Sequence, residues 1–298
     1  MQTELLVAIL AGLGGMLGWG FADFFAKKTI DQIGDIASLA WGHVFGTLTL
    51  LTMVFYQMEV RGKEIALPEN PQTWIFMIIF GVMQALIYFL VYKGFGKGQV
   101  GLLSPVFAAF SGITAVLSIV FFGEIIGGYL LVGLVTIFIG ILLVNIDIKA
   151  FFSRRLRFTR IPGFKEVAFA TLMAGLWTLS WDVFIGGADW LSYTFFMYSF
   201  MTFAILVASA VQRVDLFAVK SSIWKFLILI GVCETFAYLA ISLGYSATPR
   251  TSVVALLSGA FSLPTIILAR MFLKEKITLI QTVGSLIIIV GIMMLSVL

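Results

Sequence analysis

The chain has 298 residues, of which 61% are hydrophobic and 11% charged, and its formal net charge is +4. A soluble domain needs about 25% charged residues for its surface, so this composition excludes an ordinary soluble protein and indicates an integral membrane protein. One histidine and one cysteine leave little for a metal site or a catalytic nucleophile, so we expect no cofactor, no metal and no enzyme activity.

Ten apolar runs follow one another along the chain, each close to the roughly 20 residues that a helix needs to cross a bilayer. They predict an all-α integral membrane protein with spanning helices over residues 3–26, 36–57, 72–93, 98–121, 125–147, 164–187, 191–212, 223–244, 250–273 and 277–297. The first run has no basic segment before it and is read as a retained helix. A basic linker, residues 148–163, separates a first five-helix repeat (1–147) from a second (164–298).

The two halves resemble each other in sequence. Shifted by 151 residues, Gly101–Val144 aligns without gaps on Ser252–Leu295 with 13 identities in 44 positions, including the pair Glu124 and Glu275. An odd number of spans in each half makes the two copies inverted in the membrane. Inverted repeats are typical of secondary transporters that work by alternating access.

Lysine and arginine predict the orientation, because these residues gather on the cytoplasmic side of a membrane protein. With both termini extracytoplasmic, sixteen of the nineteen basic residues face the cytoplasm and three face outward. We therefore expect a multi-pass protein of the plasma (inner) membrane with its central linker inside. The cluster Arg154–Arg160 in that linker suits anionic lipid. No feature favours a nucleic-acid partner, and the sequence leaves a monomer or a homodimer open.

The pattern resembles the drug/metabolite transporter superfamily, EamA type. The motifs that carry the resemblance are Leu17-Gly18-Trp19-Gly20, Gly175-Leu176-Trp177, Gly94-Phe95-Gly96, Gly244-Tyr245-Ser246, Ser104-Pro105-Val106-Phe107-Ala108-Ala109, Phe121-Phe122-Gly123-Glu124 and Phe272-Leu273-Lys274-Glu275. The resemblance implies a transporter of small metabolites with a central cavity lined by helices 1, 3, 4, 6, 8 and 9. One departure concerns helix nine, where Leu256 stands at the Pro105 position and Pro264 follows eight residues later. This predicts a displaced break in that helix.

Glu234 is a lone carboxylate in the apolar run 223–244, where a charge costs roughly 2.5–3.5 kcal/mol on insertion scales. Its counterpart at an offset of 150 is Gln84, and each residue has a tyrosine four positions later, Tyr238 and Tyr88. Residues four apart share a helix face. We expect all four residues to bind substrate and Glu234 to couple protons or bind an amine. The alternative is a glutamate that only hydrogen-bonds neighbouring helices.

Helices one and six carry aromatic residues near carboxylates, an arrangement that suits an organic cation or an aromatic substrate. Trp19, Trp177 and Trp181 are therefore candidate substrate-binding residues, although tryptophans also anchor helices at membrane boundaries. Asp23 and Asp182 lie toward opposite ends of these two helices and are interpreted as opposite gates. Asp23 could instead pair with the lysine that follows four residues later.

His43, a few residues into helix two, titrates near neutral pH and is a second candidate for proton coupling. The plainer alternative is a neutral, buried histidine bonded to a backbone carbonyl.

These features predict a secondary-active transporter, proton-coupled or an exchanger, that moves a small polar metabolite by alternating access. An amino acid or a related amine is the favoured substrate class. An organic-cation carrier of the choline type is the first alternative. A membrane scaffold or lipid-binding subunit that transports nothing is the second.

Overall fold

The computed structural model describes residues 2–97, 106–123, 126–145, 162–273 and 279–296. In the first half the helices are α1 (Gln2–Ile33), α2 (Asp35–Arg61), α3 (Pro71–Lys97), α5 (Phe110–Phe122) and α6 (Gly128–Asn145). In the second half they are α8 (Phe164–Ile185), α9 (Trp190–Val211), the short 3-10 turn η2 (Ser221–Ile223) with α10 (Trp224–Ala247), α11 (Thr251–Gly259), α12 (Ser262–Leu273) and α13 (Leu279–Ser296).

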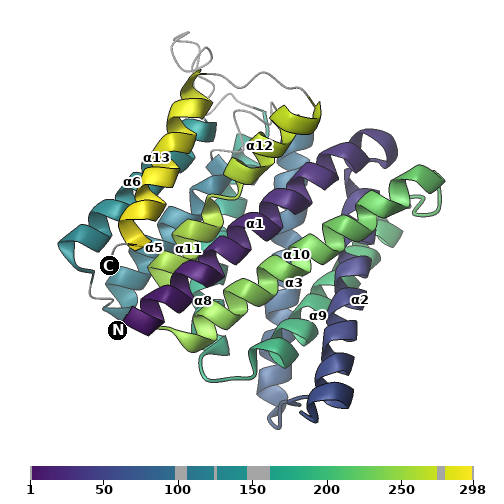
Figure 1. Ribbon diagram of the computed structural model, residues 1–298. Helices are drawn as coiled ribbons and strands as arrows, with labels where there is room; N and C mark the ends of the chain where they lie inside the picture. Colours follow the sequence, from purple (N-terminus) through teal and green to yellow (C-terminus); the bar gives the residue numbers. More distant parts are fainter. Residues whose placement is uncertain (1, 98–105, 124–125, 146–161, 274–278, 297–298) are drawn as a thin grey trace.

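The expected ten-helix architecture is confirmed, with the ninth helix formed in two pieces, α11 and α12 (Figure 1). Within the described part of the chain, six helices are long and apolar enough to cross a membrane. The shorter apolar helices are Val106–Phe122, Gly128–Leu143, Thr251–Thr265 and Thr282–Met294. The cluster Arg154–Arg160, Glu124 and Glu275 lie outside the described residues.

Local sequence signals end the long helices at their membrane boundaries. Gly62 closes α2 in the left-handed conformation (φ 60°), where its N–H bonds the carbonyl of Gln57. Glycine suits this position because it has no Cβ to clash. Asp189 caps α9, and its side chain accepts a hydrogen bond of 2.8 Å from the N–H of Ser192.

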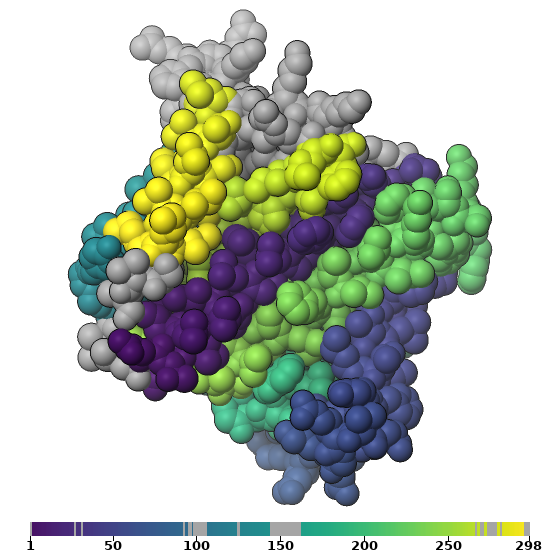
Figure 2. All heavy atoms as spheres, in the orientation of Figure 1, coloured from purple at the N-terminus to yellow at the C-terminus, as the bar shows by residue number. Residues whose placement is uncertain are grey.

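The helices pack with approximate two-fold symmetry. α1 lies against α10 as α8 lies against α3, and α2 lies against α10 as α9 lies against α3. The pairs α6·α13 and α2·α9 join a helix to its own repeat equivalent, and α5 of the fourth helix lies against α11 of the ninth. Figure 1 shows α6 and α13 side by side, and Figure 2 shows α1 against α10 across one face of the molecule. This exchange of partners is the packing that inverted repeats produce.

Two equivalent glycines show that the symmetry extends to atomic contacts. A methyl group added at Gly231 or at Gly81 would meet backbone atoms of the neighbouring helix at 2.4–2.8 Å. The crowding residues are Gly42, Phe45 and Gly46 of α2 around Gly231, and Met197, Phe200 and Met201 of α9 around Gly81. Each α2 residue corresponds to one α9 residue at an offset of 155. Small residues at these points let the helices approach closely without help from a hydrophobic driving force.

The fourth and ninth helices are interrupted at equivalent positions. A turn at Ala109 precedes α5, and a turn at Ala260 and Phe261 separates α11 from α12. Ala109 and Ala260 correspond at the repeat offset of 151. The break in the ninth helix thus lies between Leu256, which stands at the Pro105 position, and Pro264, as expected. Pro264 is the third residue of α12, in the first helical turn, where the missing N–H of proline disrupts nothing.

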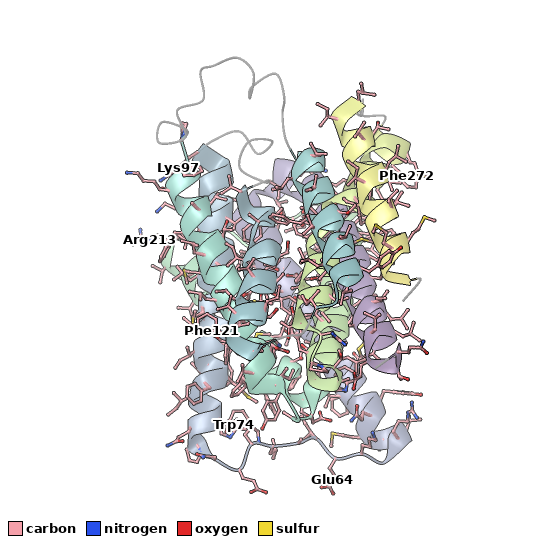
Figure 3. The ribbon with its side chains drawn as sticks, turned by 90° about the vertical axis from the view of Figure 1, so that its left-hand side faces the viewer. Glu64, Trp74, Lys97, Phe121, Arg213 and Phe272 are labelled. Carbon is pink, nitrogen blue, oxygen red and sulfur yellow. The ribbon has the colours of Figure 1, made fainter. Side chains whose placement is uncertain are left out.

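The two ends of the bundle carry different side chains. Figure 3 places Lys97 and Arg213 at one end and Glu64 and Trp74 at the other. At the first end, Lys97 of α3 forms an ion pair with Glu166 at the start of α8. This end also includes the turn between α9 and α10, with Lys220 and Lys225. Lys97, Arg213, Lys220 and Lys225 thus lie at the same end of the bundle.

Candidate functional site

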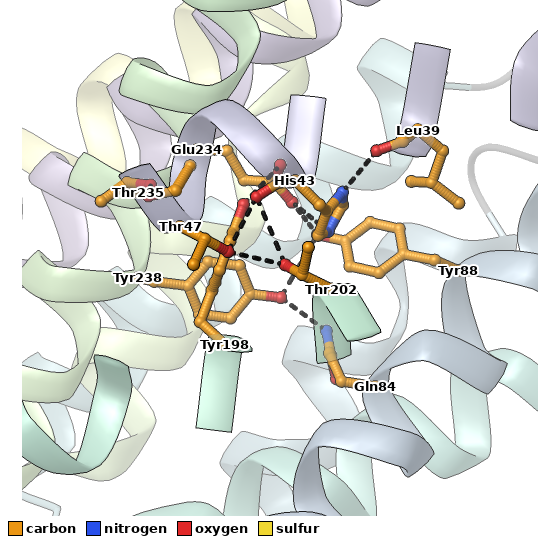
Figure 4. A network of polar contacts seen from close by, with 11 residues as sticks. Leu39, His43, Thr47, Gln84, Tyr88, Tyr198, Thr202, Glu234, Thr235 and Tyr238 are labelled. Carbon is orange, nitrogen blue, oxygen red and sulfur yellow. Dashed lines mark hydrogen bonds and ion pairs between the residues drawn. The ribbon is translucent and has the colours of Figure 1, made fainter. Parts of the chain in front are cut away.

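A cluster of buried polar side chains lies about halfway along four helices (Figure 4). It consists of His43 on α2, Gln84 and Tyr88 on α3, Tyr198 on α9, and Glu234 and Tyr238 on α10. Tyr88 is partly buried, and the others are buried. Water cannot reach such groups in the hydrocarbon region, so each must find partners within the protein. The structure thus brings together Glu234, Tyr238, Gln84, Tyr88 and His43.

Both oxygens of the Glu234 carboxylate are occupied. The Tyr88 hydroxyl donates to Oε1 at 2.9 Å, and the Tyr198 hydroxyl donates to Oε2 at 3.2 Å. His43 Nε2 lies within ion-pair distance of Oε1, at 3.3 Å, although it makes no hydrogen bond of regular geometry. Glu234 therefore ties α10 to α2, α3 and α9.

The contacts of His43 indicate where a proton is shared with Glu234: on the side of Nε2, not of Nδ1. Nδ1 lies 2.9 Å from the carbonyl of Leu39, which can only accept, so Nδ1 carries a hydrogen. A neutral ring would then turn the lone pair of Nε2 toward Oε1. If Glu234 were ionised as well, two electron pairs would face each other in a buried site. A proton placed between Nε2 and Oε1 removes this repulsion, either as imidazolium with carboxylate or as imidazole with carboxylic acid.

The remaining members form a directed chain of hydrogen bonds that ends on Glu234. The amide of Gln84 donates from Nε2 to the Tyr238 hydroxyl at 2.8 Å. The two phenol oxygens of Tyr238 and Tyr88 are 3.3 Å apart. Because Tyr88 donates to Glu234 and Tyr238 accepts from Gln84, Tyr238 must be the donor to Tyr88. Phenol rings pack around these bonds, with Tyr198 stacked on the ring of His43 at 5.3 Å between centroids.

The cluster lies on the pseudo-two-fold axis. The bonds from Gln84 to Tyr238 and from Tyr88 to Glu234 are equivalent at the offset of 150. On α2 and α9, at the offset of 155, Thr47 and Thr202 bond each other at 2.9 Å. His43 and Tyr198 are equivalent at the same offset. The two halves thus differ at this site by an acid on one side and a base on the other.

Comparison with known proteins places the chain. The model of the EamA-like transporter family matches residues 6–146 and again residues 165–297, which together are most of the sequence. The chain belongs to the EamA-like transporter family. It is therefore a multi-pass membrane protein of a family that transports small molecules. The comparison with curated proteins gave no match.

Solved structures agree with this EamA-like fold. One crystal structure, described only as that of a protein, superposes with a TM-score of 0.77 over 97% of this chain and 96% of its own. The two sequences are 14% identical, so the likeness concerns the fold alone.

In this EamA-like chain, Trp19 lies beside the cluster. Its ring packs edge-on against Tyr238 at 5.8 Å between centroids. On its other sides are Phe110 at 6.4 Å and Phe261 at 6.2 Å, both at the helix interruptions. Phe110 and Phe261 are repeat equivalents, so Trp19 also lies close to the axis.

Trp177 and Trp181 lie on α8, apart from these contacts, and face α3 and α10. Their rings stack on each other at 5.6 Å. The indole N–H of Trp177 donates to the carbonyl of Phe80 at 2.9 Å, and that of Trp181 to the hydroxyl of Ser242 at 3.3 Å. Both donors are thus already bonded within the protein. Their role in substrate binding stays a prediction.

The two candidate gate residues lie toward opposite ends of the bundle. Asp182 is buried and accepts a hydrogen bond of 2.6 Å from Thr251 at the start of α11. Asp23, on α1, is exposed. Their gate role stays a prediction.

The two aspartates do not occupy equivalent positions in the repeat. The carbonyl of Gly20 accepts from Thr265, and that of Gly175 accepts from Thr114. Packing therefore pairs Gly20 with Gly175 at an offset of 155. Asp23 and Asp182 are 159 residues apart, one helical turn out of this register.

Sequence reasoning missed Tyr198 and the threonine pair of α2 and α9. The resemblance implied a centre lined by helices 1, 3, 4, 6, 8 and 9, whereas helices 2 and 7 supply His43 and Tyr198. The sequence does contain a signal for these residues. An offset of 155 between helices 2 and 7 aligns Phe45 with Phe200 and Thr47 with Thr202, and it places Tyr198 opposite His43.

Proposed function

We propose that this chain is a proton-linked secondary-active transporter of a small polar metabolite, with an amino acid or a related amine as the favoured class. The observation that carries the proposal is the buried pair of His43 and Glu234, 3.3 Å apart, at the centre of an inverted repeat. An ionisable group within the membrane is costly and is normally kept for function. Here the group holds one proton that it can release, and the repeat supplies two related conformations for alternating access.

The hydrogen bonds favour a proton role for Glu234 over direct binding of an amine. Tyr88, Tyr198 and His43 already occupy the carboxylate oxygens. A substrate ammonium would have to displace one of them, whereas a proton can leave or enter the pair with the heavy atoms in place. The carrier then alternates between a neutral and a negatively charged centre as the proton moves.

The organic-cation alternative has less support from the same contacts. A quaternary ammonium is held by open aromatic faces around a free carboxylate. The rings of Trp177 and Trp181 cover each other, and that of Tyr198 covers His43. A scaffold without transport would need no proton at its centre, because buried apolar residues of similar size would stabilise the bundle as well.

Flux in proteoliposomes tests the proposal. The purified wild-type protein is reconstituted and given radiolabelled amino acids, primary amines and choline, with and without a pH gradient. We expect at least one amino acid or amine to accumulate with the gradient and to equilibrate without it. Accumulation of choline alone would favour the organic-cation carrier. Empty liposomes are the control, and flux no faster than theirs for every compound would contradict a carrier function.

We also propose that both termini are extracytoplasmic in the plasma (inner) membrane and that the central linker is cytoplasmic. In a Cys233→Ala background, Glu64→Cys and Ala218→Cys place single thiols at exposed positions in loops at opposite ends of the bundle. Because basic residues favour the inside, an impermeant thiol reagent should label position 64 in intact cells and position 218 only after lysis. The reverse pattern of labelling would invert the topology.

A further inference from the structure

Two polar atoms beside the proton site lack partners. Trp19 Nε1 and Gln84 Oε1 are both buried, and neither has a hydrogen-bond partner among the residues that the structure describes. Gln84 as a whole is 8% exposed, and its other amide atom already donates to Tyr238. Trp19 packs on the ring of the same tyrosine. An open donor and an open acceptor thus flank Tyr238.

These atoms lie close to the interruptions of two repeat-related helices. Phe110 and Phe261, which pack on Trp19, mark the interruptions of the fourth and ninth helices. In transporters built from inverted repeats, substrate sites lie at the repeat interface beside interrupted helices. Buried polar groups are almost always hydrogen-bonded, and an exception calls for an explanation such as an absent ligand.

We infer that Trp19 Nε1 and Gln84 Oε1 form a two-point subsite for a ligand group that carries a hydrogen-bond acceptor and a donor side by side. The indole N–H donates to the acceptor, and the amide oxygen accepts from the donor. An α-amino acid head group and a primary amide both meet this requirement. A quaternary ammonium group has no N–H and cannot donate. An ionised carboxylate has acceptors but no donor, and a protonated amine has donors but no acceptor. The inference rests on the proposed transport function and narrows its substrate class.

The subsite is joined to the proton pair by the hydrogen bonds already described. Gln84 donates to Tyr238, Tyr238 to Tyr88, and Tyr88 to Glu234. A ligand that bonds Oε1 of Gln84 polarises the amide and strengthens this chain of donors toward the carboxylate. Occupancy of the subsite is therefore linked to the carboxylate of Glu234 through three hydrogen bonds.

A thermal-shift panel tests the ligand class. The probes are the L-amino acids and their primary amides, primary amines, carboxylic acids and quaternary ammonium compounds, each added to the purified full-length protein. A specific ligand raises the unfolding temperature by mass action. We expect the stabilising compounds to carry both a donor and an acceptor. Hits confined to amines, acids or quaternary ammonium compounds would overturn the subsite while leaving transport intact.

Trp19→Phe separates the indole N–H from the packing of the ring. For the best hit and its analogue without the acceptor, dissociation constants are measured with the wild type and the variant. We expect roughly 10-fold weaker binding of the hit and little change for the analogue, because only the hit loses a hydrogen bond. Trp74→Phe is the matched control, since that indole N–H is bonded to Pro68 and lies at one end of the bundle.

The outcomes distinguish the subsite from the proposed function. Equal weakening of the hit and its analogue by Trp19→Phe would assign Trp19 to packing and overturn the subsite. If flux in proteoliposomes persists alongside that result, the proposed transport function is retained although the subsite is not. A wild-type protein that neither binds nor moves any compound of the panel would overturn both.

Discussion

Replacement of Glu234 by glutamine should give a protein that folds and inserts normally but no longer couples flux to a pH gradient. The amide keeps the shape of the side chain: its oxygen, at the position of Oε2, accepts from Tyr198, and its NH₂ group, at the position of Oε1, donates to Nε2 of His43. The cost of placing a charge in the membrane is also removed. What the variant loses is the ability to bind and release a proton. Accumulation driven by the gradient should therefore fall to the level of equilibration.

The measurement is initial flux and final accumulation in proteoliposomes, at equal protein content, with and without a pH gradient. Glu64→Gln makes the same chemical change at an exposed position in the loop between α2 and α3, and it should behave as the wild type. Wild-type accumulation by Glu234→Gln, with unchanged dependence on pH, would reduce Glu234 to a hydrogen-bonding group between helices. A variant that fails to insert would contradict the claim that shape is kept.

Gly231→Ala should destabilise the protein by about 1–3 kcal/mol, the usual effect of an added methyl group in a packed interior. The new Cβ would lie 2.4 Å from the backbone nitrogen of Gly46 and 2.6 Å from the carbonyl oxygen of Gly42. Because a backbone atom within a helix cannot move without the rest of the helix, α2 and α10 must separate. Separation lengthens the bond of 3.0 Å from Thr235 to the carbonyl of Gly46. It also moves His43 away from Glu234.

Thermal unfolding in detergent measures this loss, and proteoliposome flux measures its effect on coupling. Gly127→Ala is the matched control, because a Cβ there meets nothing within 4 Å and the backbone is not left-handed. We expect the control to unfold at the wild-type temperature and Gly231→Ala several degrees lower. Equal unfolding temperatures for the two variants would mean that the contact of α2 with α10 is looser than the structure has it.

Hydropathy and the repeat predict the ten helices and their inverted arrangement, because both depend on composition and spacing alone. The offset of 150 also predicts that Gln84, Tyr88, Glu234 and Tyr238 belong together, since each pair repeats on one helix face. The contact of His43 with Glu234 was beyond prediction. It depends on the rotation of α2 about its own axis, which is set by close packing at Gly42 and Gly231.

The same limit applies to the register between helices one and six. In an apolar helix, a shift of one turn preserves the hydrophobic pattern, so matching tryptophans and aspartates is as plausible as matching glycines. Packing decides the register, because Gly20 and Gly175 lie against the first turns of α12 and α5. Trp19 therefore reaches the axis, whereas Trp177 bonds a backbone carbonyl in α3.

Glu234 belongs to the second half of the chain and His43 to the first. This division bears on how the chain diverged from a duplicated ancestor. A first half paired with a copy of itself would place two histidines and two glutamines around the axis, and no carboxylate. A second half paired with itself would oppose two glutamates, and no imidazole. Neither half contains the complete pair, so the fused chain gained a chemical capability that no symmetric assembly of either half possesses.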